Sequence, residues 1–168
     1  LETKGDITVK ASGHGVAGEA SAVIAVVKQP VTVTAEEAVL KVGLKGQTAG
    51  KITLTETEAG MLKSGKKLEV YLENASGITI AEEPTVKVTE GDLSIGEVEV
   101  EDVTNANGKV TGTKVVIEVK RASKSASTVE IKDFQMDTDR TVPQGSYDIE
   151  LAGTALTELE DDSLTVED

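Results

Sequence analysis

The sequence lacks cysteine and tryptophan, and its only aromatic side chains are Phe134, Tyr71 and Tyr147. Without cysteine the chain can form no disulfide, no thiol nucleophile and no cysteine-based zinc or iron–sulfur site. With so few aromatic residues, the core has to be built from Val, Ile, Leu and Ala. A glycosidase needs only two carboxylates, but the aromatic platform on which a sugar ring stacks is missing here.

Positive charge is also scarce, because 17 Lys and Arg stand against 30 Asp and Glu, for a formal net charge of −13. A phosphate backbone requires a basic protein surface, so this charge argues against a nucleic-acid partner. Long apolar runs are absent as well. The longest, Ala22–Val27, has six residues, whereas a membrane-spanning helix needs about 20. We therefore expect no transmembrane segment and a location outside the cell, where a high negative charge favours solubility.

The residues that are abundant favour β-structure. Val (22), Thr (20) and Ile (9) account for 51 of the 168 residues, and β-branched side chains suit a pleated surface. Short segments of alternating polarity recur every 8–12 residues with turn signals between them, a spacing typical of sandwiches and barrels. The sequence predicts an all-β fold, a β-sandwich that is immunoglobulin-like or jelly-roll-like.

Two further features refine this prediction. Thr55-Glu56-Thr57-Glu58 has the spacing of a capping box, which predicts one short helix near residues 56–63. The alternation over Glu37–Leu44 indicates another strand. The glycines between Gly13 and Gly18, together with Pro30, separate the first part of the chain from the rest. We therefore expect an N-terminal β-extension over residues 1–35, a possible donor strand, and a sandwich domain over residues 36–168.

Residues with catalytic or ligating chemistry form no convincing set. His14 has no second histidine as a partner, and no Gly-x-Ser-x-Gly elbow is present. The glycines around His14 match a dinucleotide-binding pattern only superficially, since a β-like segment and no helix follows them. The sequence thus predicts no enzyme, no catalytic residue and no cofactor.

Calcium is the metal that the acidic clusters favour, because it takes oxygen ligands alone. The candidate ligands are Asp137, Asp139, Glu160, Asp161 and Asp162. Neither cluster follows the EF-hand pattern, and turn residues with an acidic tail explain them better than a calcium site does. Asn74-Ala75-Ser76 is a glycosylation sequon, which makes Asn74 a candidate modification site.

Three stretches of the chain resemble known domains. They are Lys51–Leu72, the segment Pro84-Thr-Val-Lys-Val-Thr-Glu-Gly-Asp-Leu and the segment Asp139-Arg-Thr-Val-Pro-Gln-Gly-Ser-Tyr-Asp-Ile. They are similar to β-rich domains of exported bacterial cell-surface proteins, found beside copper-amine-oxidase-N-terminal-like or wall-anchoring modules. The resemblance covers about residues 37–156 and implies a bacterial cell-surface location. It carries over no catalytic residue.

These observations lead to two functional hypotheses. The first is a structural subunit of an extracellular filament or surface layer, a homopolymer that assembles head-to-tail by β-strand addition. The residues expected at that assembly contact are Ile7, Val9, Val23, Val26 and Val27. The alternative is an adhesive or polysaccharide-binding module of a larger surface protein, for which Tyr71 and Tyr147 are the aromatic candidates. If the five assembly residues instead form ordinary strands within one domain, no donor strand is left for the first hypothesis.

Overall fold

The computed structural model describes residues 5–11, 20–27, 29–72 and 76–156. These residues form strands and turns without any helix, which confirms the predicted all-β class. The strands are β1 (Gly5–Ala11), β2 (Ala20–Val27), β3 (Val31–Ala35), β4 (Gln47–Thr48), β5 (Ile52–Glu56), β6 (Lys66–Leu72), β7 (Ile78–Ile80), β8 (Thr85–Glu90), β9 (Ser94–Thr104), β10 (Val110–Arg121), β11 (Thr128–Lys132), β12 (Gln135–Thr138) and β13 (Ile149–Ala152). None of the described residues belongs to a helix long and apolar enough to span a bilayer.

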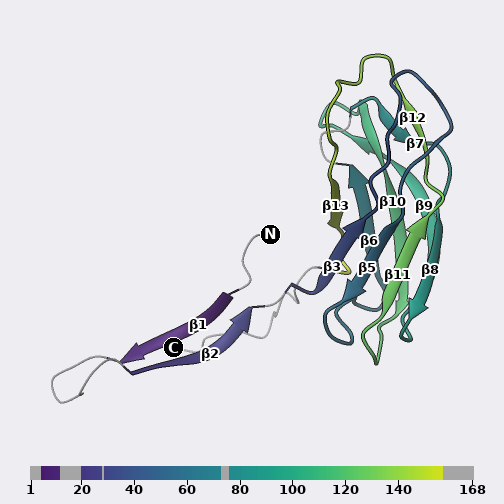
Figure 1. The fold of residues 1–168 in the computed structure, drawn as a ribbon. Coiled ribbons are helices and arrows are strands. Elements are labelled where there is room, and N and C mark those ends of the chain that lie inside the picture. The colour runs from purple at the N-terminus through teal and green to yellow at the C-terminus, as the bar shows by residue number, and fades with distance from the viewer. Residues whose placement is uncertain (1–4, 12–19, 28, 73–75, 157–168) are drawn as a thin grey trace.

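The strands from β3 onwards build a layered body, residues 29–156 (Figure 1). One antiparallel sheet has the order β13-β6-β10-β9, and a second has the order β3-β5-β11-β8. A third sheet, β4-β12-β7, lies beyond the ends of β5 and β11. In all three sheets every strand pair is antiparallel.

The core lies between the layers because apolar side chains alternate along each central strand. Ile52 and Leu54 are buried on β5, while Leu68 and Val70 are buried on β6. Within residues 29–72 and 76–156, where burial is described, this core extends from Val31 to Ala155. Its other members are Leu62, Ile78, Ile80, Leu93, Val115, Ile117, Val119, Val129, Ile131, Phe134, Met136 and Val142. Burial of many medium-sized aliphatic side chains thus replaces the aromatic core that the composition excludes.

The expected helix near residues 56–63 is wrong. Thr55 continues β5 and pairs with Thr32 and Thr128, so it cannot act as an N-cap. The chain then turns, and Gly60 has a φ of +75°, which is a left-handed conformation that interrupts a helix. The expected strand over Glu37–Leu44 is also wrong, because this segment forms a loop with no ladder partner.

A tight turn at Asn105–Gly108 joins β9 to β10. Gly108 N donates to Asn105 O at 2.9 Å, and the Asn105 Oδ1 atom accepts from Asn107 N at 3.0 Å and Lys109 N at 3.1 Å. The side-chain amide therefore closes the turn, as Asn commonly does.

The first two strands form a separate hairpin. β1 and β2 pair antiparallel with each other, with an irregularity between Ile7 and Thr8, and they form a two-stranded sheet of their own. Figure 1 shows this hairpin projecting away from the layered body. β3, which falls within the expected extension of residues 1–35, pairs instead with β5 in the body.

Candidate functional site: an apolar groove at an open sheet edge

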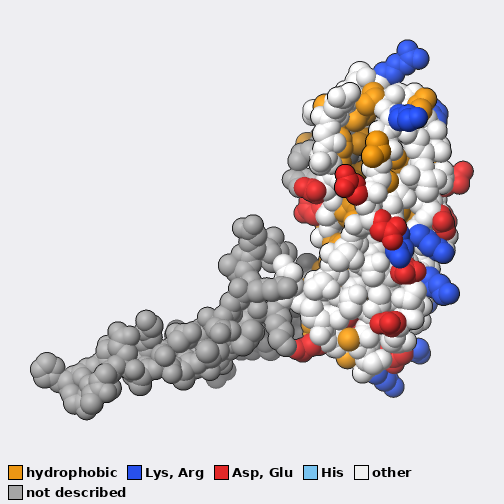
Figure 2. Space-filling view, in the orientation of Figure 1, with side chains coloured by type: hydrophobic (Ala, Val, Ile, Leu, Met, Phe, Trp, Pro, Cys, Tyr) orange, Lys and Arg blue, Asp and Glu red, His pale blue; other side chains and the backbone are white. Residues whose placement is uncertain are grey.

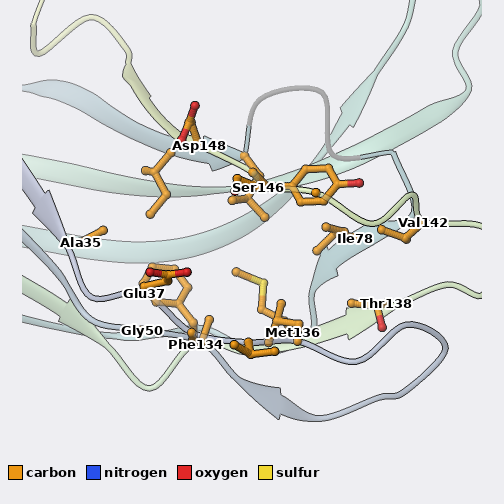
Figure 3. A pocket seen from close by; sticks show the side chains of 18 of the residues that line it. Ala35, Glu37, Gly50, Ile78, Phe134, Met136, Thr138, Val142, Ser146 and Asp148 are labelled. Carbon is orange, nitrogen blue, oxygen red and sulfur yellow. The ribbon is translucent and has the colours of Figure 1, made fainter.

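The layered body contains a groove of about 920 Å³ (Figure 3). Residues 35–42, with Ala49 and Gly50, form one wall, and residues 142–149 form the other. The floor consists of apolar side chains, namely Ile52, Val70, Leu72, Ile78, Ile80, Phe134 and Met136. Since all of these except Leu72 belong to the buried core, the groove gives access to the interior of the molecule.

The groove lies between two unpaired strand edges. β13 and β3 are the terminal strands of their sheets on this side, so each has one edge without a ladder partner among the described residues. An open strand edge offers a row of backbone donors and acceptors for a further strand. The site therefore combines an apolar floor with main-chain hydrogen-bonding groups at its rim.

The first wall is held by the side chains of Gln47 and Thr138. Gln47 Oε1 accepts from Lys41 N at 2.6 Å, and Gln47 Nε2 donates to Lys41 O at 2.9 Å and Leu44 O at 3.1 Å. The buried Thr138 hydroxyl donates to Lys41 O at 2.7 Å. These bonds replace the ladder that a strand over this segment would have provided, and they fix the loop in position.

At the start of the same wall, the loop passes very close to Gly50. A Cβ atom at this position would collide with the carbonyl of Glu36, so the position requires glycine. Glu36 N also donates to Lys51 O at 2.8 Å. Hydrogen bonding to the carboxylate of Glu130, and then to that of Glu36, raises the pKa of Lys51. The Lys51 ammonium thus remains charged between the two acids.

The second wall carries one of the two tyrosines. The Tyr147 hydroxyl donates to Pro143 O at 2.9 Å, which closes a short turn before β13. Tyr71 on β6 also lines the groove. The structure therefore brings together the two aromatic residues that the sequence proposed for a sugar site.

The surface around the groove is partly apolar. Figure 2 shows hydrophobic side chains gathered over the upper part of this face of the layered body. Val39 and Val42 are large exposed apolar residues on the first wall, and Val39 is 88% exposed. Leu44, two residues beyond this wall, is also exposed. Glu37 and Asp148 also line the groove and place negative charge at its mouth (Figure 3).

The predicted assembly residues all lie on β1 and β2. Ile7 faces Ala25 and Val9 faces Ala22 across the ladder, while Val23, Val26 and Val27 face Thr8, Asp6 and Gly5. The hairpin thus brings all five into one element. This hairpin lies apart from β13, whose first residue lines the groove, in the same chain (Figure 1).

The calcium candidates are only partly described. Asp137 Oδ1 accepts from Gly46 N at 2.8 Å, and its carboxylate lies 3.6 Å from Lys45 Nζ. Asp139 N donates to Gly77 O at 2.8 Å in a turn. In the part of the chain that the structure describes, no three His, Asp or Glu residues form a group that could hold a metal ion. Glu160, Asp161, Asp162, Asn74 and His14 lie outside the described residues.

A polar cluster surrounds Glu56, the last residue of β5. Its carboxylate accepts from Ser123 Oγ at 2.5 Å and from Leu62 N and Ser127 N at 3.0 Å each. The Glu56 side chain is buried, and no described buried side-chain polar atom lacks a partner. With every donor satisfied, the cluster ties the turn after β5 to the loop before β11, and this structural role accounts for its buried charge.

The adjoining loop supplies a pH-dependent contact. Asp92 Oδ1 accepts from Lys124 N at 2.8 Å and Ser125 N at 3.1 Å, and these backbone bonds lower the pKa of Asp92 below its ordinary 3.8. A lowered folded-state pKa stabilises the fold above the unfolded value, and the contribution is lost as the pH falls through the folded value. Urea unfolding at about pH 6 and about pH 3 should therefore show that acid destabilises wild type more than Asp92→Asn. Equal acid sensitivity would contradict this assignment.

Comparisons with known proteins do not assign this chain to a family. No family model matches the sequence, and neither a curated protein nor a solved structure shows a significant similarity.

Proposed function

We propose that the layered body is a β-sandwich, immunoglobulin-like or jelly-roll-like, and that it is a structural subunit of an extracellular bacterial filament or surface layer. Subunits assemble head-to-tail by strand addition, with the hairpin of one copy supplying a strand to the groove of the next. No catalytic step and no cofactor is part of this role.

One observation carries the proposal: the groove opens the core between two unpaired edges. Its floor is made of core side chains such as Phe134 and Ile52, and its walls are formed by residues 35–42 and residues 142–149. An added strand would pair with an open edge and place alternate side chains on that floor. Because the accepting groove and the donating hairpin are different parts of the chain, the contact is heterologous and propagates into a fibre unless rotation closes a ring.

The test of this proposal is removal of residues 1–28. Where the structure describes burial, in residues 29–72 and 76–156, the core extends from Val31 to Ala155, and β1 and β2 form a sheet of their own. We therefore expect the shortened chain to keep its circular dichroism spectrum and its cooperative melt. We expect the full chain to form filaments in electron microscopy and the shortened chain to remain monomeric in light scattering. Filaments that persist after the deletion would rule out the hairpin as the donor.

The alternative function, a polysaccharide-binding or adhesive module, is favoured by the position of Tyr71 and Tyr147 in one groove. Sugar rings stack on exposed aromatic faces. If this function is correct, the full chain binds a glycan on an array, and Tyr147→Ala abolishes binding. A monodisperse monomer without any glycan signal would favour neither role.

A further inference from the structure

Two segments of the chain can be aligned without a gap and share a pattern of residue types. Residues 5–13 read Gly-Asp-Ile-Thr-Val-Lys-Ala-Ser-Gly, and residues 145–153 read Gly-Ser-Tyr-Asp-Ile-Glu-Leu-Ala-Gly. Glycine stands at both ends of each segment. Between the glycines, apolar residues stand at every second position in the same phase, so that Ile7, Val9 and Ala11 correspond to Tyr147, Ile149 and Leu151. The first segment contains β1, and the second contains β13 and part of the second groove wall.

The two segments differ in their partners. β1 has an antiparallel partner, β2, along its whole length. β13 pairs with β6 on one side and is the last strand of its sheet on the other. Among the residues that the structure describes, this second edge of β13 therefore lacks the partner that β1 has. That edge borders the groove, because Ile149 and the four residues before it line the second wall.

We propose that β2 of one copy of this chain pairs antiparallel with the free edge of β13 in a second copy, as it pairs with β1 in its own hairpin. This inference rests on the proposed function and names the donor strand, the accepting edge and the register. In this pairing each residue of β1 is replaced by the residue of the second segment that aligns with it. The β1–β2 register then places Ser21 opposite Glu150, Ala22 opposite Ile149 and Ala25 opposite Tyr147.

The composition of β2 suits this site. Its eight residues, Ala20–Val27, are uncharged and apolar except for Ser21. A strand of Ala, Val and Ile brings no charge to the apolar floor around Phe134 and Met136, so its insertion leaves no ionised group buried without a partner. Exchange of β1 for β13 replaces one antiparallel partner of β2 with another, a strand of four residues in place of one of seven.

The experiment uses cysteine cross-linking in the full chain, which has no cysteine of its own. One sample mixes the single variants Ser21→Cys and Glu150→Cys. The control mixes Ser21→Cys with Thr34→Cys, which lies on β3, the other open edge. Glu150 and Thr34 are both exposed, so both substitutions are tolerable. Each mixture is oxidised under assembly conditions, polymer is measured by light scattering, and disulfide-linked peptides are identified by mass spectrometry.

We expect polymer in both mixtures, with the 21–150 disulfide exceeding the 21–34 disulfide about tenfold, since a disulfide requires Cα atoms roughly 4.4–6.8 Å apart. Polymer that contains the 21–34 link, or neither link, overturns the inference and leaves the proposed function standing. Failure of the unsubstituted chain to polymerise overturns both.

Discussion

Replacing Glu56 with alanine is expected to lower the free energy of unfolding by about 3 kcal/mol, because each buried donor left without an acceptor costs about 1–3 kcal/mol. The carboxylate accepts from two backbone amides, of Leu62 and Ser127, and from the hydroxyl of Ser123. The Glu56 side chain is 2% exposed, so the alanine variant offers these donors little direct access to water.

Chemical denaturation of matched variants tests this expectation. Glu56→Gln keeps one acceptor oxygen but turns an amide group toward the remaining donors, so its loss should be intermediate. Glu99→Ala removes an exposed carboxylate from β9 and should change the free energy of unfolding by less than about 0.5 kcal/mol. If Glu56→Ala behaves like Glu99→Ala, the cluster does not stabilise the fold.

Glu56 also shows where local sequence reasoning fails. Thr55 and Glu58 have the spacing of a helix start, and that local signal is genuine. In the structure, Thr55 gains ladder partners on both sides, and the Glu56 carboxylate bonds to Ser123, which lies 67 residues away in the sequence. Tertiary contacts therefore outweigh a one-turn capping preference, whose contribution is typically about 1 kcal/mol.

Strand positions were far easier to predict than loop positions. β6 and β11 have clear alternation of apolar and polar residues, and the structure buries Leu68 and Val70 on β6 and Val129 and Ile131 on β11. The segment Glu37–Leu44 alternates as well, yet it is a loop. Its backbone is satisfied by Gln47 and Thr138, and the contact between these two spans 91 residues of sequence. Alternation of apolar and polar residues does not show whether the backbone of a segment will pair with a neighbouring strand or with side chains, as it does here.

The groove itself has no signature in a single sequence. Phe134 and Met136 read simply as core residues, and nothing local indicates that space remains beside them. The sequence did direct attention to the aromatic residues and to the N-terminal strands, because both are unusual in this chain. What it could not supply was the meeting of residues 35–42 with residues 142–149, which depends on the folding of the whole body.

Replacing Phe134 with alanine is expected to lower the free energy of unfolding by about 3–5 kcal/mol, the usual cost of removing a buried aromatic side chain. Phe134 is 2% exposed, packs within the core and forms part of the groove floor. Val39→Ala is the matched control on the groove wall. Its side chain is 88% exposed, so the change should be within about 0.5 kcal/mol. Urea unfolding, followed by far-ultraviolet circular dichroism, measures both.

The same two variants show whether assembly depends on the floor of the groove or only on its rim. If an added strand packs on the floor, Phe134→Ala should weaken polymerisation under conditions where the variant is still folded, because an alanine there gives the strand less apolar surface to contact. Val39→Ala should polymerise as wild type does. A folded Phe134→Ala variant that assembles with an unchanged critical concentration would show that the added strand does not reach the floor, and would confine the contact to the edge of β13.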